Sequence, residues 1–245
     1  MSKEKKEKGS SLGETVSVIV QALILAVILR TFLYQPFSIP SGSMKPTLLI
    51  GDYLFVSKFS YGYSHHSLPF SPEFFSGRVW ASEPKRGDVA VFKFPPNTNI
   101  DYIKRVIGLP GDKIQLREGV LYINEEAVKR EREAESYLDD ENSSGPVPVF
   151  RETLPNGVSY LTLDINPRSL GDNTPVFEVP QGHYFMMGDN RDNSADSRFE
   201  VGFVPFENFV GRASVLFFSM RNGSHPLAVW KWPEDLRYDR LFDGL

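Results

Sequence analysis

Three segments of the sequence hold polar side chains in arrangements that could do chemistry. The first is 40–46 (PSGSMKP), where two prolines restrict the backbone on either side of a Ser-Gly-Ser run. Gly42 has no Cβ, so the backbone there could approach a ligand closely. Such a turn could present the hydroxyl of Ser41 or Ser43 and a free backbone N–H to one carbonyl group. A plain Ser/Gly/Pro turn is the commoner interpretation of these residue types alone.

The second segment, 101–112 (DYIKRVIGLPGD), begins as a strand that carries a lysine. Because side chains alternate along a strand, Lys104 shares its face with one aromatic and one aliphatic residue. Burial among apolar groups disfavours the ammonium and could lower its pKa from about 10.4 towards neutrality, as a general base requires. Lys58 and Lys93 lie in the same kind of pattern, so periodicity does not choose among the three lysines.

The third segment, 188–198 (GDNRDNSADSR), contains three Asp, two Asn, two Ser and two Arg, which is too polar for a core strand. It favours a turn network of side-chain-to-backbone hydrogen bonds and Asp–Arg pairs. A calcium loop is the alternative, because acidic and hydroxyl residues alternate over 192–196. The EF-hand pattern, however, requires Gly and Glu where Ser197 and Phe203 stand.

The elements that must position these segments are short strands. Candidate strands are rich in β-branched and aromatic residues and are bounded by Gly, Pro or Asp. They lie at 52–59, 88–94, 101–107, 119–124, 160–164, 182–188 and 213–220. Between them, 60–84 is rich in aromatics, Ser and Pro, which predicts an extended loop or hairpin. Residues 125–141 carry eight acidic and three basic residues and predict a solvated segment.

A membrane anchor is predicted at 15–34, where Arg30 is the only charge. At ~1.5 Å per residue, about twenty residues match a ~30 Å hydrocarbon core. A cleavable signal peptide is the alternative, but the residues that follow the apolar run are bulky and offer no small-x-small site. The four lysines within 1–14 place this N-terminus in the cytoplasm, and the chain from Gln35 onward outside.

Composition excludes several classes of protein. A length of 245 residues suits one medium domain or two small ones. The net charge of −4 disfavours a nucleic-acid partner. The sequence has no cysteine, so a disulfide framework, a thiol nucleophile and a Cys-ligated metal are all excluded.

Taken together, the segments resemble bacterial signal peptidase I (leader peptidase), a family of membrane-anchored serine endopeptidases. The resemblance rests on blocks in the family's order and spacing, at 41–48, 51–52, 85–88, 102–112 and 188–198. It implies a mainly β fold, in which a single N-terminal transmembrane helix precedes an antiparallel β catalytic domain with an inserted smaller β domain. On this pattern, 35–112 and 183–245 form the catalytic domain and 113–182 the insert.

The resemblance also implies a Ser/Lys dyad, with Ser43 as nucleophile and Lys104 as general base. It is the family, and not periodicity, that selects Lys104 among the three lysines. The Ser43 N–H and the Ser41 hydroxyl would form the oxyanion hole. The residues implied to orient the lysine or brace the site are Ser194, Asp196 and Arg198.

The implied reaction removes N-terminal signal peptides from exported preproteins after an Ala-x-Ala-like motif, without a metal or other cofactor. Shallow pockets would select small side chains by excluding larger ones. The residues that match pocket-lining positions are Phe37, Ile39, Pro40, Met44, Leu48, Tyr102 and Ile103. The implied setting is the bacterial cytoplasmic membrane. The implied partners are preproteins, the lipid bilayer and a nearby export translocase, with no nucleic acid.

Two other classes of protein remain possible. One is a membrane-anchored β-rich binding or assembly factor without catalysis, which variants of the dyad would distinguish. The other is a Ser/Lys self-cleaving repressor of related fold. Such repressors carry a helix-turn-helix domain, whereas a membrane span stands at this N-terminus.

Overall fold

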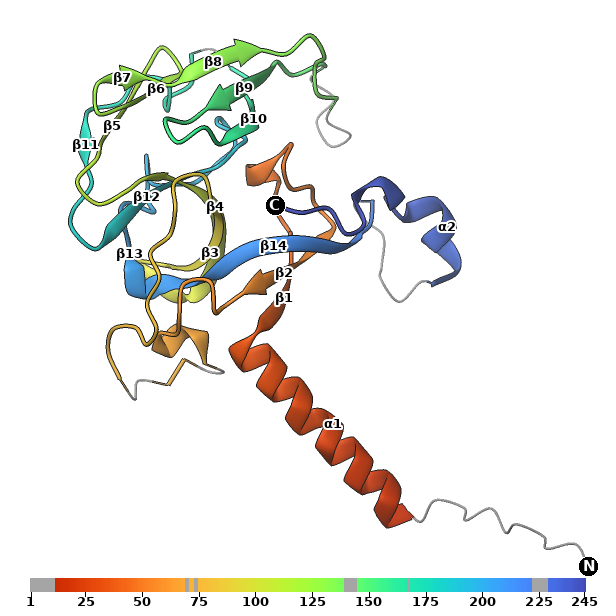
Figure 1. The fold of residues 1–245 in the computed structure, drawn as a ribbon. Helices are drawn as coiled ribbons and strands as arrows, with labels where there is room; N and C mark the ends of the chain where they lie inside the picture. Colours follow the sequence, from red (N-terminus) through yellow and green to blue (C-terminus); the bar gives the residue numbers. More distant parts are fainter. Residues whose placement is uncertain (1–11, 69–70, 73–74, 139–144, 167, 222–228) are drawn as a thin grey trace, which may run out of the picture.

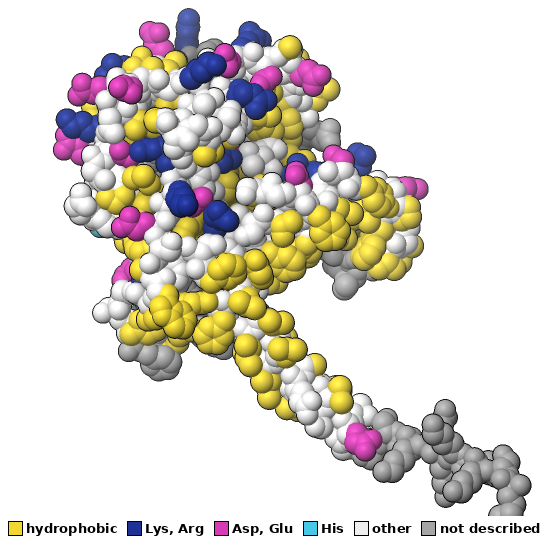
Figure 2. Space-filling model, in the orientation of Figure 1, with side chains coloured by type: hydrophobic (Ala, Val, Ile, Leu, Met, Phe, Trp, Pro, Cys, Tyr) yellow, Lys and Arg dark blue, Asp and Glu magenta, His cyan; other side chains and the backbone are white. Residues whose placement is uncertain are grey.

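A computed structural model describes residues 12–68, 71–72, 75–138, 145–166, 168–221 and 229–245. A long helix, α1 (Leu12–Phe32), leads into a body of β-sheets (Figure 1). Thr31 is its only buried residue, and hydrophobic side chains run along the face of α1 that Figure 2 shows. Its length and composition suit a membrane span. The basic stretch predicted to precede the span lies mostly in 1–11, outside the described residues.

The body is built on a seven-stranded antiparallel sheet of order β1-β2-β14-β3-β4-β12-β13. The last of these strands in the chain, β14, therefore lies between two of the earliest. The mainly β fold class with one N-terminal apolar helix is thus confirmed. The strands are β1 (Tyr34–Ser38), β2 (Asp52–Ser57), β3 (Val89–Phe94), β4 (Asn97–Gly108), β12 (His183–Met187), β13 (Val204–Pro205) and β14 (Phe209–Ser219).

Two smaller antiparallel sheets are formed by residues between β4 and β12. One has the order β11-β5-β6-β7 and the other β10-β9-β8. Strands β7 and β8 fall in the acidic stretch expected to be irregular, and β8 is an edge strand, where exposed charges are tolerated. The strands are β5 (Lys113–Arg117), β6 (Val120–Ile123), β7 (Glu126–Ala127), β8 (Lys129–Arg132), β9 (Val149–Thr153), β10 (Ser159–Leu163) and β11 (Phe177–Glu178).

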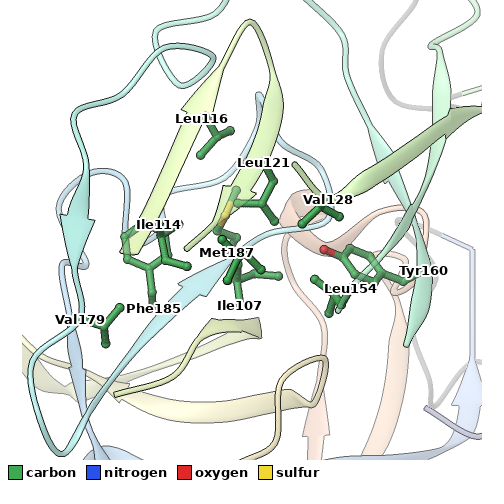
Figure 3. Packing of buried hydrophobic residues seen from close by; sticks show 11 residues of the cluster. Ile107, Ile114, Leu116, Leu121, Val128, Leu154, Tyr160, Val179, Phe185 and Met187 are labelled. Carbon is green, nitrogen blue, oxygen red and sulfur yellow. The ribbon is translucent and has the colours of Figure 1, made fainter. Parts of the chain in front are cut away.

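A continuous hydrophobic cluster joins the large sheet to the smaller ones (Figure 3). Ile107 of β4 and Met187 of β12 are fully buried in it. They pack with Ile114 and Leu121 from the β5–β6 hairpin and with Tyr160 of β10. Strand β4, which carries Lys104, and strand β12, which leads into 188–198, are therefore held by a core that all three sheets share.

The C-terminal tail returns to the large sheet after a short helix, α2 (Trp232–Asp235). The Phe242 N–H donates to the Leu216 carbonyl of β14 at 2.8 Å. Arg240 forms an ion pair with the buried carboxylate of Asp52 at 2.6 Å, so the tail is fastened to two strands of the sheet. Short 3-10 helices in the described residues are η1 (Gly42–Met44), η2 (His65–Ser67), η3 (Phe206–Asn208), η4 (Val229–Lys231) and η5 (Tyr238–Arg240).

Candidate active site

The serine-bearing turn and the lysine strand meet in the large sheet. Ser43 lies in η1, which follows β1, and Lys104 lies in the second half of β4. The Lys104 Nζ donates a hydrogen bond to the Ser43 Oγ at 2.7 Å. Ser43 is only 7% exposed and Lys104 only 4%, so water is largely excluded from this contact.

The surroundings of Lys104 favour its neutral form. Burial lowers the pKa of Lys104 to about 8, and it outweighs the carboxylates of Asp196 and Asp189, which raise the pKa. The Nζ also donates to the Ile103 carbonyl at 3.0 Å. A neutral amine in hydrogen-bond contact with a hydroxyl is the arrangement that general-base activation of a serine requires.

The other two lysines of the sequence pattern have different partners. The Lys58 Nζ donates to the Ser67 carbonyl. The Lys93 Nζ forms an ion pair with Asp101 at 2.9 Å. Lys104 is the one of the three whose hydrogen bond to a serine hydroxyl is seen in the described residues.

The Ser41 hydroxyl lies beside the nucleophile candidate. Its Oγ is 3.4 Å from the Ser43 Oγ, and the residue is exposed. Both serines line one groove. An oxyanion forming at Ser43 would therefore have the Ser41 hydroxyl within reach as a donor.

The 188–198 segment holds the serine turn from the other side. The Asn190 backbone N–H donates to the Ser43 carbonyl at 3.0 Å, and its side-chain amide donates to the Gly42 carbonyl at 3.1 Å. At Gly188, a Cβ would lie 2.5 Å from the Ser43 carbonyl oxygen and 2.3 Å from the Ser194 Oγ. Only a residue without a side chain fits there, which explains the glycine.

Asp196 and Arg198 form a fully buried pair. The Arg198 Nε and Nη2 each donate to the Asp196 carboxylate at 2.9 Å, and both side chains are 0% exposed. The same carboxylate accepts the Gly188 N–H at 3.0 Å. The Arg198 guanidinium also donates to the Arg191 carbonyl, so the pair ties the two ends of the segment together.

Ser194 differs from what the resemblance implies. Its hydroxyl is buried but makes no hydrogen bond to a described residue. The second hydrogen bond of the Lys104 amine goes to the carbonyl of its own neighbour, Ile103. Ser194 nevertheless lies next to Gly188 and so at the back of the serine turn.

Four residues that the sequence patterns did not single out hold this arrangement. Arg105 donates to Asp189 through Nε at 2.8 Å and Nη2 at 2.6 Å, both buried. Arg191 forms a buried ion pair with Glu152 of β9. The Arg105–Asp189 pair could have been expected from the sequence, because the two residues carry opposite charges. They also lie in two segments that were expected to meet, the lysine strand and the 188–198 turn. Glu152 gave no such signal, because its strand was not predicted.

A cavity of about 550 Å³ opens beside the two serines and the lysine. Five of the predicted pocket residues line it: Phe37, Ile39, Pro40, Tyr102 and Ile103. Met44 and Leu48 do not line it, because both are fully buried in the hydrophobic cluster formed with β2 and β14. Lining residues that were not predicted include Val91, Ile100, Asn193 and Ala195.

A family model and the sequences of curated relatives agree on one family. The family model described as "Signal peptidase, peptidase S26" matches residues 12–218. Signal peptidase I of Rickettsia typhi is 40% identical over 262 residues, covering 100% of this chain and 98% of that protein. Signal peptidase I of Rickettsia canadensis is 43% identical over 238 residues, covering 90% and 89%. A crystal structure of a signal peptidase I from Enterococcus faecalis V583 matches 54% of this chain and 98% of its own, with 29% identity and a TM-score of 0.33.

Proposed function

Since this chain belongs to the signal peptidase family, peptidase S26, we propose that it removes signal peptides from exported preproteins with Ser43 as nucleophile and Lys104 as general base. The observation that carries the dyad is the 2.7 Å hydrogen bond from the Lys104 Nζ to the Ser43 Oγ. Burial of the lysine supports it, since a neutral amine is the form that can accept a proton.

The reaction has two halves. In the first, neutral Lys104 takes the Ser43 proton while the Oγ attacks the scissile carbonyl carbon. The resulting ammonium then protonates the leaving amine as the C–N bond breaks, which leaves an ester on Ser43. In the second half, Lys104 takes a proton from a water that attacks this ester, and Ser43 regains its proton.

The charge that develops on the carbonyl oxygen in each half needs donors in place beforehand. We assign this role to the Ser43 N–H and the Ser41 hydroxyl, which lies 3.4 Å from the nucleophile. Losing one such donor typically costs ~10²–10³ in rate. Asn190, Asp196 and Arg198 are positioning residues, because they hold the backbone of the serine turn and of the segment behind it.

The groove supports selection of small side chains. Its lining beside the dyad is mostly apolar and includes Phe37, Ile39 and Ile103. We propose that subsites within this groove fit small side chains best, since a difference of one methylene in an apolar pocket is worth about 1–3 kcal/mol. Cleavage after an Ala-x-Ala-like motif is the preference that such a groove supports.

The placement follows from α1. As a single span, it would fix the enzyme in the bacterial cytoplasmic membrane, with the preceding basic stretch inside and the β body outside. There the enzyme shares a bilayer with its preprotein substrates and lies close to the export translocase. We assign catalysis to 35–112 and 183–245, and treat 113–182 as an inserted second β domain.

The decisive experiment measures cleavage of a purified preprotein by the detergent-solubilised chain, with the product ends determined by mass spectrometry. We expect Ser43→Ala and Lys104→Ala each to abolish cleavage. The double variant should be no worse than either single one, because members of a catalytic unit are non-additive.

Lys93→Ala is the matched control, because Lys93 lies on the neighbouring strand and pairs with Asp101 instead of a serine. If Lys93→Ala or Lys58→Ala abolished cleavage while Lys104→Ala did not, the base assignment would be wrong. If the wild-type chain bound preproteins without cutting them, a non-catalytic binding or assembly factor would be the better description.

A further inference from the structure

A second, larger cavity is lined by residues of the last turns of α1 and of the β body. Figure 1 shows the end of α1 meeting this body. The cavity measures about 1200 Å³, and its lining includes Arg30 and Thr31 of the helix together with Lys58 and Lys93. Two hydrogen bonds fix the helix end against the following segment. The Lys58 N–H donates to the Leu33 carbonyl at 3.0 Å, and the Tyr63 hydroxyl donates to the Phe32 carbonyl at 2.6 Å.

Two of the cations that line this cavity, Arg30 and Lys58, form no ion pair with a carboxylate of the described residues. Arg30 makes no ion pair with any carboxylate in the described part of the chain, and the buried Lys58 donates only to a backbone carbonyl, that of Ser67. The nearest carboxylate that acts on Lys58 is Asp101, which is already paired with Lys93. Burial first, and then the charge of Arg30, lower the pKa of Lys58 to about 8. An anion in the cavity would relieve both effects.

The described lining residues include two acids, Asp101 and Glu207. Asp101 is neutralised by its ion pair with Lys93, so Glu207 is the acid that opposes an anion in the cavity. His66 adds no charge near neutral pH, because burial lowers its pKa to about 4. Its Nδ1 is buried and has no hydrogen-bond partner in the described residues, so one ring nitrogen is left for a ligand.

We propose that this cavity binds the phosphate group of a phospholipid of the outer leaflet, held by Arg30 and Lys58. The inference rests on the proposed membrane placement of α1, which puts the last turn of the helix at the depth of the lipid headgroups. A phosphodiester supplies the oxygen acceptors that a guanidinium and an ammonium lack here. Exposed apolar side chains beside the cavity, including Leu33 and Phe59, would lie against the acyl chains. The volume fits a headgroup with its glycerol rather than a single ion.

The test uses the full-length protein in a mild non-ionic detergent and native mass spectrometry. The probes are phosphatidylglycerol and a diacylglycerol with the same acyl chains but no phosphate. We expect the wild-type protein to retain one phosphatidylglycerol and little diacylglycerol. The double variant Arg30→Gln/Lys58→Gln should retain about tenfold less phosphatidylglycerol. The matched control Lys85→Gln/Arg212→Gln, which removes two cations that line a separate cavity, should retain it as the wild type does.

Three outcomes would overturn the inference: equal retention of both lipids, unchanged retention by the double variant, or complete displacement of the lipid by millimolar inorganic phosphate. The last would indicate a site for a soluble anion. The melting temperature of each variant shows whether it is folded, and flotation with vesicles shows whether α1 inserts. Preprotein cleavage is measured separately, so failure of the lipid site and failure of the proposed peptidase activity give different results.

Discussion

The proposed role of Lys104 as a base for Ser43 depends on how completely Lys104 is removed from water. A lysine at 4% exposure, with apolar and aromatic neighbours, loses much of the hydration that stabilises an ammonium in solution. Two carboxylates, those of Asp196 and Asp189, oppose this effect without cancelling it. The balance leaves an amine that can act as a base just above neutral pH and can return its proton to a leaving group.

The pH dependence of cleavage follows from that balance. Because the pKa of Lys104 is lowered to about 8, the lysine is mostly protonated below this pH and cannot accept the Ser43 proton. We expect kcat/KM for a short peptide to rise with pH through about 8 and to level off above it. Rates measured between about pH 6 and pH 10 would show this inflection.

Lys58 provides the control for that profile, because burial and Arg30 lower its pKa to about 8 as well. Lys58→Gln should retain the inflection at the same pH, since its amine does not contact the serines. If the pH profile of Lys58→Gln became flat, the inflection in the wild type would come from Lys58 and not from Lys104.

The sequence predicts that a buried lysine could serve the site, but it does not predict which lysine or which apolar side chains line the groove. The alternation of side chains along a strand predicts that Lys104 lies on a face that could be buried. The same pattern fits Lys58 and Lys93. It cannot choose among the three, because a period of two residues does not tell which strand passes the serine turn. Met44 and Leu48 match the pocket positions of the family, yet they are fully buried beneath the groove. Which apolar side chains reach a groove surface depends on the turn geometry of η1, which no local pattern encodes.

At the level of elements, the serine turn is held by contacts with a segment far away in sequence. Its carbonyl groups at Gly42 and Ser43 both accept hydrogen bonds from Asn190. The turn at Gly188 passes so close behind the serine that its missing side chain is a structural requirement. Ser43, the proposed nucleophile, is therefore positioned by backbone packing as much as by side chains.

Gly188→Ala tests this close approach. Its Cβ would lie 2.5 Å from the Ser43 carbonyl oxygen, so the serine turn or the segment behind it must shift. We expect a loss of about a hundredfold or more in kcat and about 1–3 kcal/mol in the free energy of unfolding. The measurements are peptide cleavage and urea unfolding.

Gly244→Ala is the matched substitution, because a Cβ there meets nothing within 4 Å. It should change neither quantity appreciably. Equal activity of Gly188→Ala and the wild type would contradict this prediction, because it would show that the serine turn can shift without loss of function.

The strands differ in how well the sequence predicts them. The strands predicted at 52–59 and 88–94 coincide with β2 and β3. Their apolar residues, which alternate or form a continuous run, pack into the hydrophobic core. Strands β1, β5 and β9 were not predicted. β1 contains a proline, and β5 and β9 mix charged with apolar residues. These strands form because a partner strand supplies the pairing, which a pattern within one segment cannot show.

At the scale of the whole molecule, the three-stranded sheet β10-β9-β8 is joined to the 188–198 segment through buried charged residues. The Arg191 Nη1 donates to Glu152 of β9 at 2.7 Å, and the Tyr160 hydroxyl of β10 donates to the same carboxylate at 2.9 Å. The Arg105 guanidinium stacks 4.1 Å from the Tyr160 ring. The β9–β10 hairpin is therefore joined to both residues that flank the site, one next to Lys104 and one next to Asn190.

Glu152→Gln should destabilise the whole protein. It would leave the Arg191 guanidinium buried without its counter-charge, which typically costs about 3–5 kcal/mol. We expect a lower melting temperature together with a lower kcat, because Arg191 adjoins the residue that holds the serine turn.

The comparison for this variant is Glu133→Gln. Its partner Arg151 is exposed, and such surface pairs contribute about 0–1 kcal/mol. Equal melting temperatures for the two variants would show that the small sheets do not support the site in this way.

Removal of α1 tests the role of the anchor. A truncated protein that begins at Gln35 retains both members of the dyad, and we expect it to cleave short peptides. It should lose much more efficiency on preproteins inserted in vesicles, because a membrane anchor would confine enzyme and substrate to one surface. It should also tend to aggregate without detergent, since exposed aromatic residues such as Phe59 would face water. Equal losses on both substrates would mean that α1 maintains the fold instead.

The position of β14 in the large sheet has a consequence for biosynthesis. The chain enters the sheet at β1 and β2, which adjoin the serine turn, and continues through β3 and β4, which carry the lysine. These two halves are joined only by β14, which is made more than a hundred residues after Lys104. At ribosomal rates this interval lasts on the order of ten seconds. During that time the two halves of the dyad have no shared sheet to bring them together. We therefore expect that a chain ending before β14 cleaves no peptide although it contains both Ser43 and Lys104, because the strands beside these two residues then have no shared sheet.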